Sequence, residues 1–392
     1  MELIHFSDTH LGYREFHRVD SDTGINQREQ DVYDAFRSVI DKILALDPDL
    51  VIHAGDLFDK VRPTNRAVNL ATEQFARLSE AGIPTVLIAG NHDTPKISTT
   101  GTITRALDRL ANIEAVTSDL ELNGSGYRKI PVGRTLVHAV SDAPTEDKLA
   151  ESIEVLEPEE SYRWNILVIH AGISTLEDEV FSGEFNEHYL NKGILDDLGF
   201  DYVALGHYHK RMEIELSSPA KAMYPGAPER FSFNESDYEP GFLHVHFDEE
   251  GIRCEEKLLE TRNFINLGSI NGEDLTVNEI QQEIEDRLPA DGEIAGSLIS
   301  LKIRGVDENA ISMLEESCLE GLREKSFETN FQLISTDEFG ETGTSLAFAD
   351  LRTEFSDFME NRAEISEELD SDRLIETGQK YLSLALDEED DS

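Results

Sequence analysis

Five short polar segments of this sequence consist of residue types that bind metal ions. They are Asp8-Thr9-His10, Gly55-Asp56, Gly90-Asn91-His92-Asp93, His170 and Gly206-His207-Tyr208-His209. Carboxylate, amide and imidazole donors without cysteine favour Mn²⁺, with Fe or Zn as alternatives. Two such cations side by side activate a water and stabilise the charge that develops on a phosphoryl group. The segments therefore predict a two-metal centre that hydrolyses phosphate esters.

Each segment also has an ordinary explanation when it is taken alone. Asp-x-His is a weak signal, and Gly-Asp is common in turns. An Asx turn would account for Asn91 and Asp93 but not for His92. All five segments in this order are hard to obtain by chance, so the metal centre is the favoured interpretation.

Each polar segment follows a short apolar run that is rich in β-branched residues. The runs are Leu3–Phe6, Leu50–Ile52, Val86–Ile88, Ile166–Ile169 and Tyr202–Leu205. They do not alternate with polar residues, which is typical of strands buried on both faces. Helical periodicity over Arg28–Leu46 and Thr64–Ala81 places helices between the strands, which predicts an α/β fold. We expect the polar segments to converge at one sheet edge, where open α/β sheets hold ligands.

The charge balance is strongly acidic, with 34 Lys and Arg against 81 Asp and Glu and a net charge of -47. Disorder is one interpretation of such a composition, but 39% hydrophobic residues in periodic blocks can build a core. We expect instead adaptation to molar salt, where the Debye length falls to about 3 Å and self-repulsion is screened. No targeting segment or run of roughly 18–20 apolar residues is present, which predicts a cytoplasmic protein without membrane contact. Cys254 and Cys318 lie far apart, so we expect no disulfide.

The five segments together match the signature of the calcineurin-like metallophosphoesterase superfamily, D-x-H, GD, GNH[DE], H and GHxH. Three further stretches resemble the nuclease subunit of archaeal MRN/SbcD-type double-strand-break repair complexes. They are Phe6–Tyr13, Gly55–Phe58 with Arg62-Pro63, and Tyr224–Arg230. The chain is therefore identified as similar to that nuclease family, from a halophile.

The resemblance implies how the residues share two Mn²⁺ ions and what they do. One metal would take Asp8, His10, Asp56 and His209, and the other Asp56, Asn91, His170 and His207. His92 would act as general acid or stabilise the transition state. The implied activity is single-strand endonuclease and 3′–5′ exonuclease cleavage of DNA at double-strand breaks, in the nucleoid.

A domain layout follows from the change of pattern near residue 271 and from the resemblance. Residues 1–270 would form a β-sandwich flanked by helices, and residues 271–336 a small α+β domain that caps DNA. A linker at 337–345 would lead to a helix-loop-helix element at 346–386, followed by an acidic tail at 387–392. The helical pair would dock a coiled-coil ABC/SMC-type ATPase. The resemblance also implies a homodimer through Thr64–Ala81 and Ser98–Leu110.

Some features remain open. Many members of the nuclease family have histidine where this chain has Asp59, and an anionic side chain there repels phosphate unless a cation intervenes. A scaffold with secondary nuclease activity, or a phosphoesterase of non-DNA substrates, is therefore an alternative. Basic candidates for DNA contact are Arg14, Arg62, Lys210 and Arg211. A further His-x-His pair, His244 and His246, lies within a predicted strand without a glycine turn, which favours an ordinary surface-facing pair.

Overall fold

The computed structural model describes residues 1–335, apart from residues 22, 96–100, 119–125, 144, 175–187 and 290–293. The chain divides into two compact units. The first comprises the described residues of Met1–Leu267, Leu288–Ser300 and Gly321–Asn330, and the second comprises Gly268–Arg287, Leu301–Glu320 and the described residues from Phe331 to 335. The predicted linker, docking helices and acidic tail at 337–392 lie outside the described residues, as do residues 98–100 of one predicted dimer segment.

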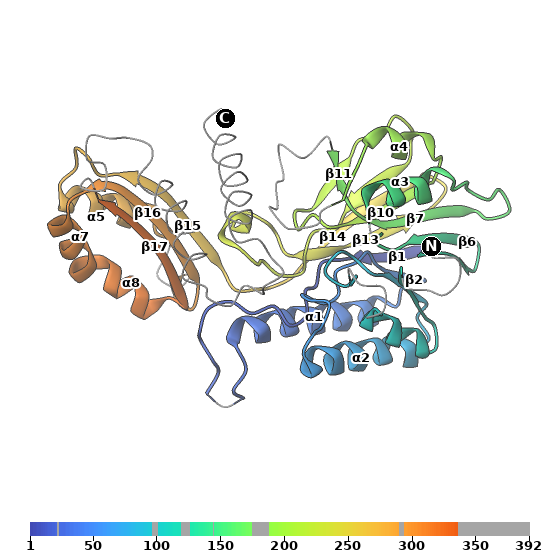
Figure 1. The fold of residues 1–392 in the computed structure, drawn as a ribbon, viewed down its shortest axis with the longest axis horizontal. Helices are drawn as coiled ribbons and strands as arrows, with labels where there is room; N and C mark the ends of the chain where they lie inside the picture. Colours follow the sequence, from blue (N-terminus) through green and yellow to red (C-terminus); the bar gives the residue numbers. More distant parts are fainter. Residues whose placement is uncertain are drawn as a thin grey trace, which may run out of the picture. The chain divides into compact units, whose positions relative to one another are not determined.

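Two six-stranded sheets form the centre of the first unit (Figure 1). In the first sheet four parallel strands are extended by two antiparallel ones, in the order β14-β13-β1-β2-β3-β4. Its strands are β1 (Glu2–Phe6), β2 (Leu50–His53), β3 (Thr85–Ile88), β4 (Ile113–Val116), β13 (Gly241–Phe247) and β14 (Ile252–Leu258).

The second sheet has the order β11-β12-β10-β7-β6-β5, with four parallel strands between two antiparallel edges. Its strands are β5 (Tyr127–Val132), β6 (Thr135–Val140), β7 (Trp164–His170), β10 (Tyr202–Gly206), β11 (Met212–Ile214) and β12 (Lys221–Tyr224). A short parallel pair joins β8 (Gly172–Ile173) to β9 (Tyr189–Leu190).

Apolar residues hold these layers together in three clusters. Leu3, Ile52 and Val168 belong to the cluster between the two sheets. Helices α1 (Gln27–Leu46) and α2 (Asn65–Glu80) bury one face each against the first sheet. Helices α3 (Glu146–Glu154) and α4 (Lys192–Asp197) pack on the outer face of the second sheet. The prediction of an α/β sandwich flanked by helices is confirmed.

One part of the prediction is wrong: the polar segments do not follow strands of a single sheet. Three segments follow β1, β2 and β3 in the first sheet, whereas His170 ends β7 and the last segment follows β10 in the second. Helices cover the outer face of each sheet, so strands of both sheets are apolar on both faces. Apolar runs of this kind do not reveal which strands pair.

The remaining elements include several that the sequence did not indicate, namely β4, β5, β12, β14, α3, α4 and β15 (Phe264–Asn271). Strand β15 begins a three-stranded sheet in the order β15-β16-β17. The other two strands are β16 (Leu298–Val306) and β17 (Glu328–Ser335). The helical elements of this part of the chain are α5 (Val277–Arg287), α7 (Glu308–Leu314), the π-helical turn η5 (Glu315–Leu319) and α8 (Glu320–Lys325). Two 3-10 helices lie earlier in the chain, at Ile103–Arg109 and Phe233–Glu235. Among the described helices, none is long and apolar enough to cross a membrane. Cys254 and Cys318 are free thiols, as expected.

Candidate metal centre

The structure places the polar ends of β1, β2, β3, β7 and β10 together, so that donor atoms from both sheets form two overlapping groups. In one group the ligand atoms of Asp8, His10 and His209 lie within 4.8 Å of one another. In the other group the atoms of Asp8, Asp56 and His170 do the same. Because the groups share a carboxylate, they form one continuous cluster.

Asp56, a member of the second group, lies between His10 of the first group and His170. Its Oδ2 is 3.9 Å from His10 Nε2 and 3.2 Å from His170 Nε2. Asn91 Oδ1 lies 3.0 Å from the same His170 nitrogen. This is the position from which one carboxylate can contact two cations.

His207 provides the clearest test of whether a metal fits. Its ring centroid is 5.5 Å from that of His170. Its Nε2 is buried and has no hydrogen-bond partner among the described residues. A buried polar nitrogen without a partner costs about 1–3 kcal/mol, and coordination would remove that cost. Together with the clustered oxygen and nitrogen donors, this unpaired atom fits a two-metal site.

Other polar groups orient two of the imidazoles. His170 Nδ1 donates to the carbonyl of Ala54 at 2.8 Å, which directs Nε2 toward Asp56 and Asn91. His209 Nδ1 lies 3.0 Å from Glu235 Oε1, while its Nε2 is 3.1 Å from His10 Nε2. Such outer partners set the tautomer and ring orientation of a ligating histidine. Glu235 was not predicted from the sequence, and no motif around it would have indicated this role.

Asp93 is turned away from the donor cluster, although its segment offered it as a further carboxylate. Its two oxygens accept the backbone N–H groups of Leu57 at 2.9 Å and Phe58 at 3.0 Å. Burial, reinforced by the charge of Asp56, raises the pKa of this carboxyl to about 7. Asp93 therefore ties the loop after β3 to the loop after β2.

His92 lies beside the cluster. Its backbone N–H donates to Asp56 Oδ1 at 2.9 Å, and its ring is 4.7 Å from the ring of His10. Its Nδ1 is 2.8 Å from the carbonyl oxygen of Asp59. The ligand atoms of His10, Asp59 and His92 also lie within 4.8 Å of one another. Asp59, the residue at which this chain departs from the family pattern, thus places its carboxylate next to His92.

The backbone at the cluster is strained. Asp8, His10, Asp56 and His207 all have positive φ, at 54°, 42°, 56° and 110°. Residues other than glycine seldom adopt this region, and where they do the site is often functional. Gly55 has φ 100°, and a Cβ there would overlap the imidazole of His170. The glycine is therefore required both by its conformation and by the close approach of a candidate ligand.

Electrostatics in the cluster follow from the burial of most of its groups, including Asp8, His10, Asp56 and His170. Burial lowers the pKa of His10 well below its usual value and that of His207 to about 3, so both rings are neutral near pH 7. Neutral imidazole is the form that binds metals. Burial opposes charge on His170, but Asp56 and then Asp8 raise its pKa to about 10. Burial likewise opposes the charge of Asp56, yet His170 and His92 hold its pKa well below the usual range.

The four basic residues singled out for DNA contact differ in how they are engaged. Arg14, Arg62 and Lys210 are exposed, and Arg14 Nε is paired with Glu29 Oε2 at 2.8 Å. The side chain of Arg211 is only 8% exposed. Its guanidinium is already bonded to Glu256 and to the carbonyl oxygens of Pro225 and Glu239.

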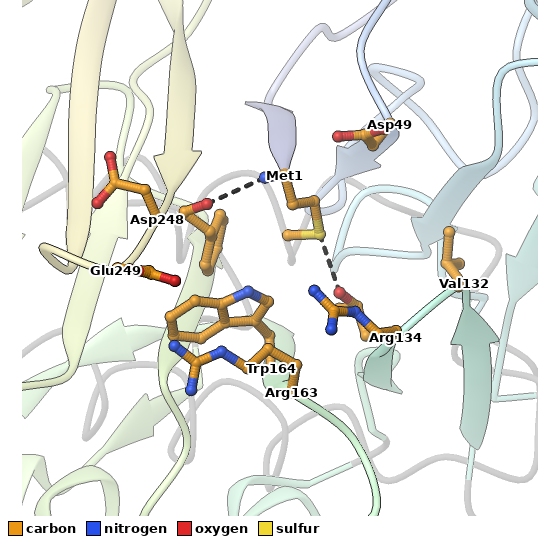
Figure 2. A pocket seen from close by; sticks show the side chains of 11 residues that line it. Met1, Asp49, Val132, Arg134, Arg163, Trp164, Asp248 and Glu249 are labelled. Atoms are coloured by element: carbon orange, nitrogen blue, oxygen red, sulfur yellow. Dashed lines mark hydrogen bonds between the residues drawn. The ribbon is translucent and has the colours of Figure 1, made fainter.

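A cavity of about 630 Å³ lies away from this chemistry. Figure 2 shows that Trp164, Arg134 and Arg163 line it. Trp164 begins strand β7, whereas His170 ends that strand, so the cavity lies at the opposite strand end from the donor cluster. Both cations and carboxylates line it, so its charge selects no class of ligand. The cations are Arg134, Arg163 and the amino group of Met1, and the carboxylates are Asp49, Asp248 and Glu249.

Comparison with known proteins gives one family. The family model described as calcineurin-like phosphoesterase matches residues 1–211. The chain is 29% identical over 359 residues to the DNA double-strand break repair protein Mre11 of Methanococcus maripaludis, covering 85% of this chain and 90% of that protein. The protein of the same name from Methanocaldococcus jannaschii is 31% identical, with 68% of each chain covered. The one from Thermoplasma acidophilum is 30% identical, with 80% of this chain and 76% of that protein covered.

Proposed function

Because the chain belongs to the calcineurin-like phosphoesterase family, and within it to the Mre11 proteins of DNA double-strand-break repair, we propose that it is a two-metal nuclease that cuts DNA. The family makes the chain a metal-dependent phosphodiesterase. The observation that supports a two-metal centre in this chain is the position of Asp56 between His10 and His170.

The ligand sets that we propose keep the arrangement implied by the sequence. Asp8, His10 and His209 would hold one Mn²⁺, Asn91, His170 and His207 the other, and Asp56 both. When bound, the two cations would supply an activated water and stabilise negative charge on the phosphoryl group. Mn²⁺ is favoured by the mixture of oxygen and imidazole donors.

His92 is the residue that we assign to proton transfer. Its Nδ1 donates to the carbonyl of Asp59, so Nε2 is the ring atom that would give a proton to the leaving oxygen when the ring is in its doubly protonated, imidazolium form. Contact with the ring of His10 and the backbone bond to Asp56 hold His92 beside the donor cluster. A general acid must lie within hydrogen-bond reach of the leaving group, and the place of His92 beside the donor cluster supports this role.

DNA is bound, in this proposal, by few cations on a strongly acidic chain. Three of the four basic candidates, Arg14, Arg62 and Lys210, are exposed and can reach phosphates. The guanidinium of Arg211 instead donates hydrogen bonds to a carboxylate and two backbone carbonyls of its own chain. Counterion release adds little affinity at molar salt. Most of the binding would therefore come from the metal ions and backbone N–H groups.

The proposed assembly extends beyond the described residues. Residues 346–386 would dock a coiled-coil ABC/SMC-type ATPase, and residues 271–336 would cap the DNA. A homodimer would form through α2 and the segment near residues 98–110. We propose that this complex processes DNA ends in the nucleoid of a salt-adapted cell, with single-strand endonuclease and 3′–5′ exonuclease activity.

A nuclease assay in molar KCl tests the proposal. Single-stranded, hairpin and duplex-end DNA are each incubated with Mn²⁺, Mg²⁺ or no added metal, with the wild type and with His92→Gln. We expect cleavage that depends on Mn²⁺ and is lost in the variant, while circular dichroism shows an unchanged fold. Full activity of His92→Gln would refute its role. Hydrolysis of bis(p-nitrophenyl) phosphate without cleavage of any DNA would refute the substrate.

The position of Asp59 favours a second candidate, a scaffold with secondary nuclease activity. A carboxylate next to His92 repels the scissile phosphate, so cleavage of duplex ends would be weak. Asp56→Asn and deletion of residues 346–392 separate the two candidates in a repair assay in cells. A scaffold tolerates the first change and fails with the second, whereas a nuclease fails with the first.

A further inference from the structure

A second group of metal-binding residue types lies in the first sheet, outside the candidate metal centre. Histidines 244 and 246 are two residues apart on β13 and therefore face the same side of the sheet. The expectation of a surface-facing pair is wrong for His244, which is only 4% exposed. Glu2, on the neighbouring strand β1, is paired directly with His246 in the antiparallel register.

These three side chains point at one another. His244 Nε2 is 3.1 Å from Glu2 Oε2, and His246 Nδ1 is 3.8 Å from Glu2 Oε1. The two imidazole centroids are 4.1 Å apart. One ligand atom from each residue lies within 4.8 Å of the others. The carboxylate thus faces both rings, as it would if all three shared one cation.

Charge favours a bound ion over a simple ion pair. His244 faces Glu2 with Nε2, the atom that an ion would take, and its buried Nδ1 has no hydrogen-bond partner among the described residues. If both rings were protonated to pair with carboxylates, two like charges would lie about 4 Å apart, and such charges repel. Glu255 adds a second carboxylate, 3.6 Å from His246 Nε2, and is itself bonded to Lys257. One divalent ion satisfies Glu2 while leaving both imidazoles neutral.

We propose that Glu2, His244 and His246 bind a divalent transition-metal ion of the zinc type at a site separate from the hydrolytic centre. Two imidazole nitrogens and one carboxylate oxygen are a donor set that Zn²⁺ takes, with the fourth position left to water. Glu2 starts β1 and Asp8 follows its end, so six residues at about 3.3 Å each place the two sites roughly 20 Å apart. The ion cross-links strand β1 to strand β13.

The site does not depend on the nuclease proposal, and metal counting tests it on the full-length chain. Wild type, Glu2→Gln and His246→Gln are dialysed to equilibrium against Zn²⁺, and bound zinc is counted by mass spectrometry. Both replaced side chains are at least partly exposed, so the variants should fold. His17→Gln, which removes an exposed histidine from outside the cluster, is the matched control.

We expect the wild type and His17→Gln to bind one zinc equivalent more than the other two variants. The extra zinc should also raise the thermal unfolding midpoint only in those two proteins, because a ligand that binds the folded state stabilises it. Mn²⁺-dependent phosphodiesterase activity should be the same in all four. Equal zinc counts in all four proteins would overturn the site, and so would a loss of zinc in His17→Gln equal to that in His246→Gln.

Discussion

Replacing Gly55 by alanine should damage the metal centre more than the fold. A non-glycine residue in the left-handed region costs about 1–2 kcal/mol. The new Cβ also overlaps the ring of His170, which must move and lose its bond to Ala54, worth about 1 kcal/mol. We expect the free energy of unfolding to fall by about 2–3 kcal/mol, which a protein of ordinary stability survives. Displacing His170 from Asp56 and Asn91 should weaken Mn²⁺ binding at least tenfold.

Urea unfolding in molar KCl and Mn²⁺ titration measure the two effects separately. Gly82→Ala is a matched control, because Gly82 also has positive φ, at 76°, and a Cβ there would have nothing within 4 Å. The control should lose only the backbone part of the stability and keep its Mn²⁺ affinity. If Gly55→Ala and Gly82→Ala behave alike in both measurements, the close approach of His170 to Gly55 has no consequence, and the reasoning is refuted.

Three other changes have expected outcomes. Glu235→Gln removes the charge that orients His209 and should weaken Mn²⁺ affinity about 10–100-fold with little change in stability. An unchanged affinity in an Mn²⁺ titration would show that Glu235 does not have that role. Asp59→His should raise the rate of 3′–5′ cleavage of duplex ends, and an unchanged rate would show that Asp59 does not limit cleavage. Burial, opposed by Arg28, raises the pKa of Glu229 from 4.5 to about 7. The folded state then holds this proton more tightly, so the free energy of unfolding falls as pH rises from about 4.5 to 7, by at most ~1.4 kcal/mol per pH unit and about 3 kcal/mol in all. Glu229→Gln should remove that slope in urea unfolding at several pH values, and an identical slope would mean that Glu229 is ionised in the fold.

The candidate ligands could be predicted because their chemistry is local. The donor residues occur in five short segments that each follow a buried strand, and glycines such as Gly55 and Gly206 mark where the backbone must approach closely. A Cβ at Gly206 would overlap the carbonyl oxygen of Ala54, which accepts from His170. The residue types therefore indicated both the donors and the tight turns that carry them.

The partition into two sheets and the role of Glu235 could not be predicted in the same way. Strand pairing depends on which apolar faces are covered, and β7, like β1, is buried at every residue after its first. Glu235 acts on His209 from a 3-10 turn 26 residues away, in a contact that exists only in the folded chain. His244 was misjudged for a related reason, because mid-strand position does not show whether a side chain is covered.

The strained turns at the metal centre are held by hydrogen bonds from the neighbouring loop. Asp8 N–H donates to the carbonyl of Gly55, and His10 N–H to that of Asp56, so the loops after β1 and β2 continue to pair beyond their strands. His207 N–H in turn donates to both oxygens of Asp8. Left-handed conformations persist only where the surroundings fix them, and here each turn is fixed by the next. Most of the ligand geometry is therefore set by the fold. Metal binding should require little additional ordering of the backbone, and metal affinity should depend mainly on the donor side chains themselves.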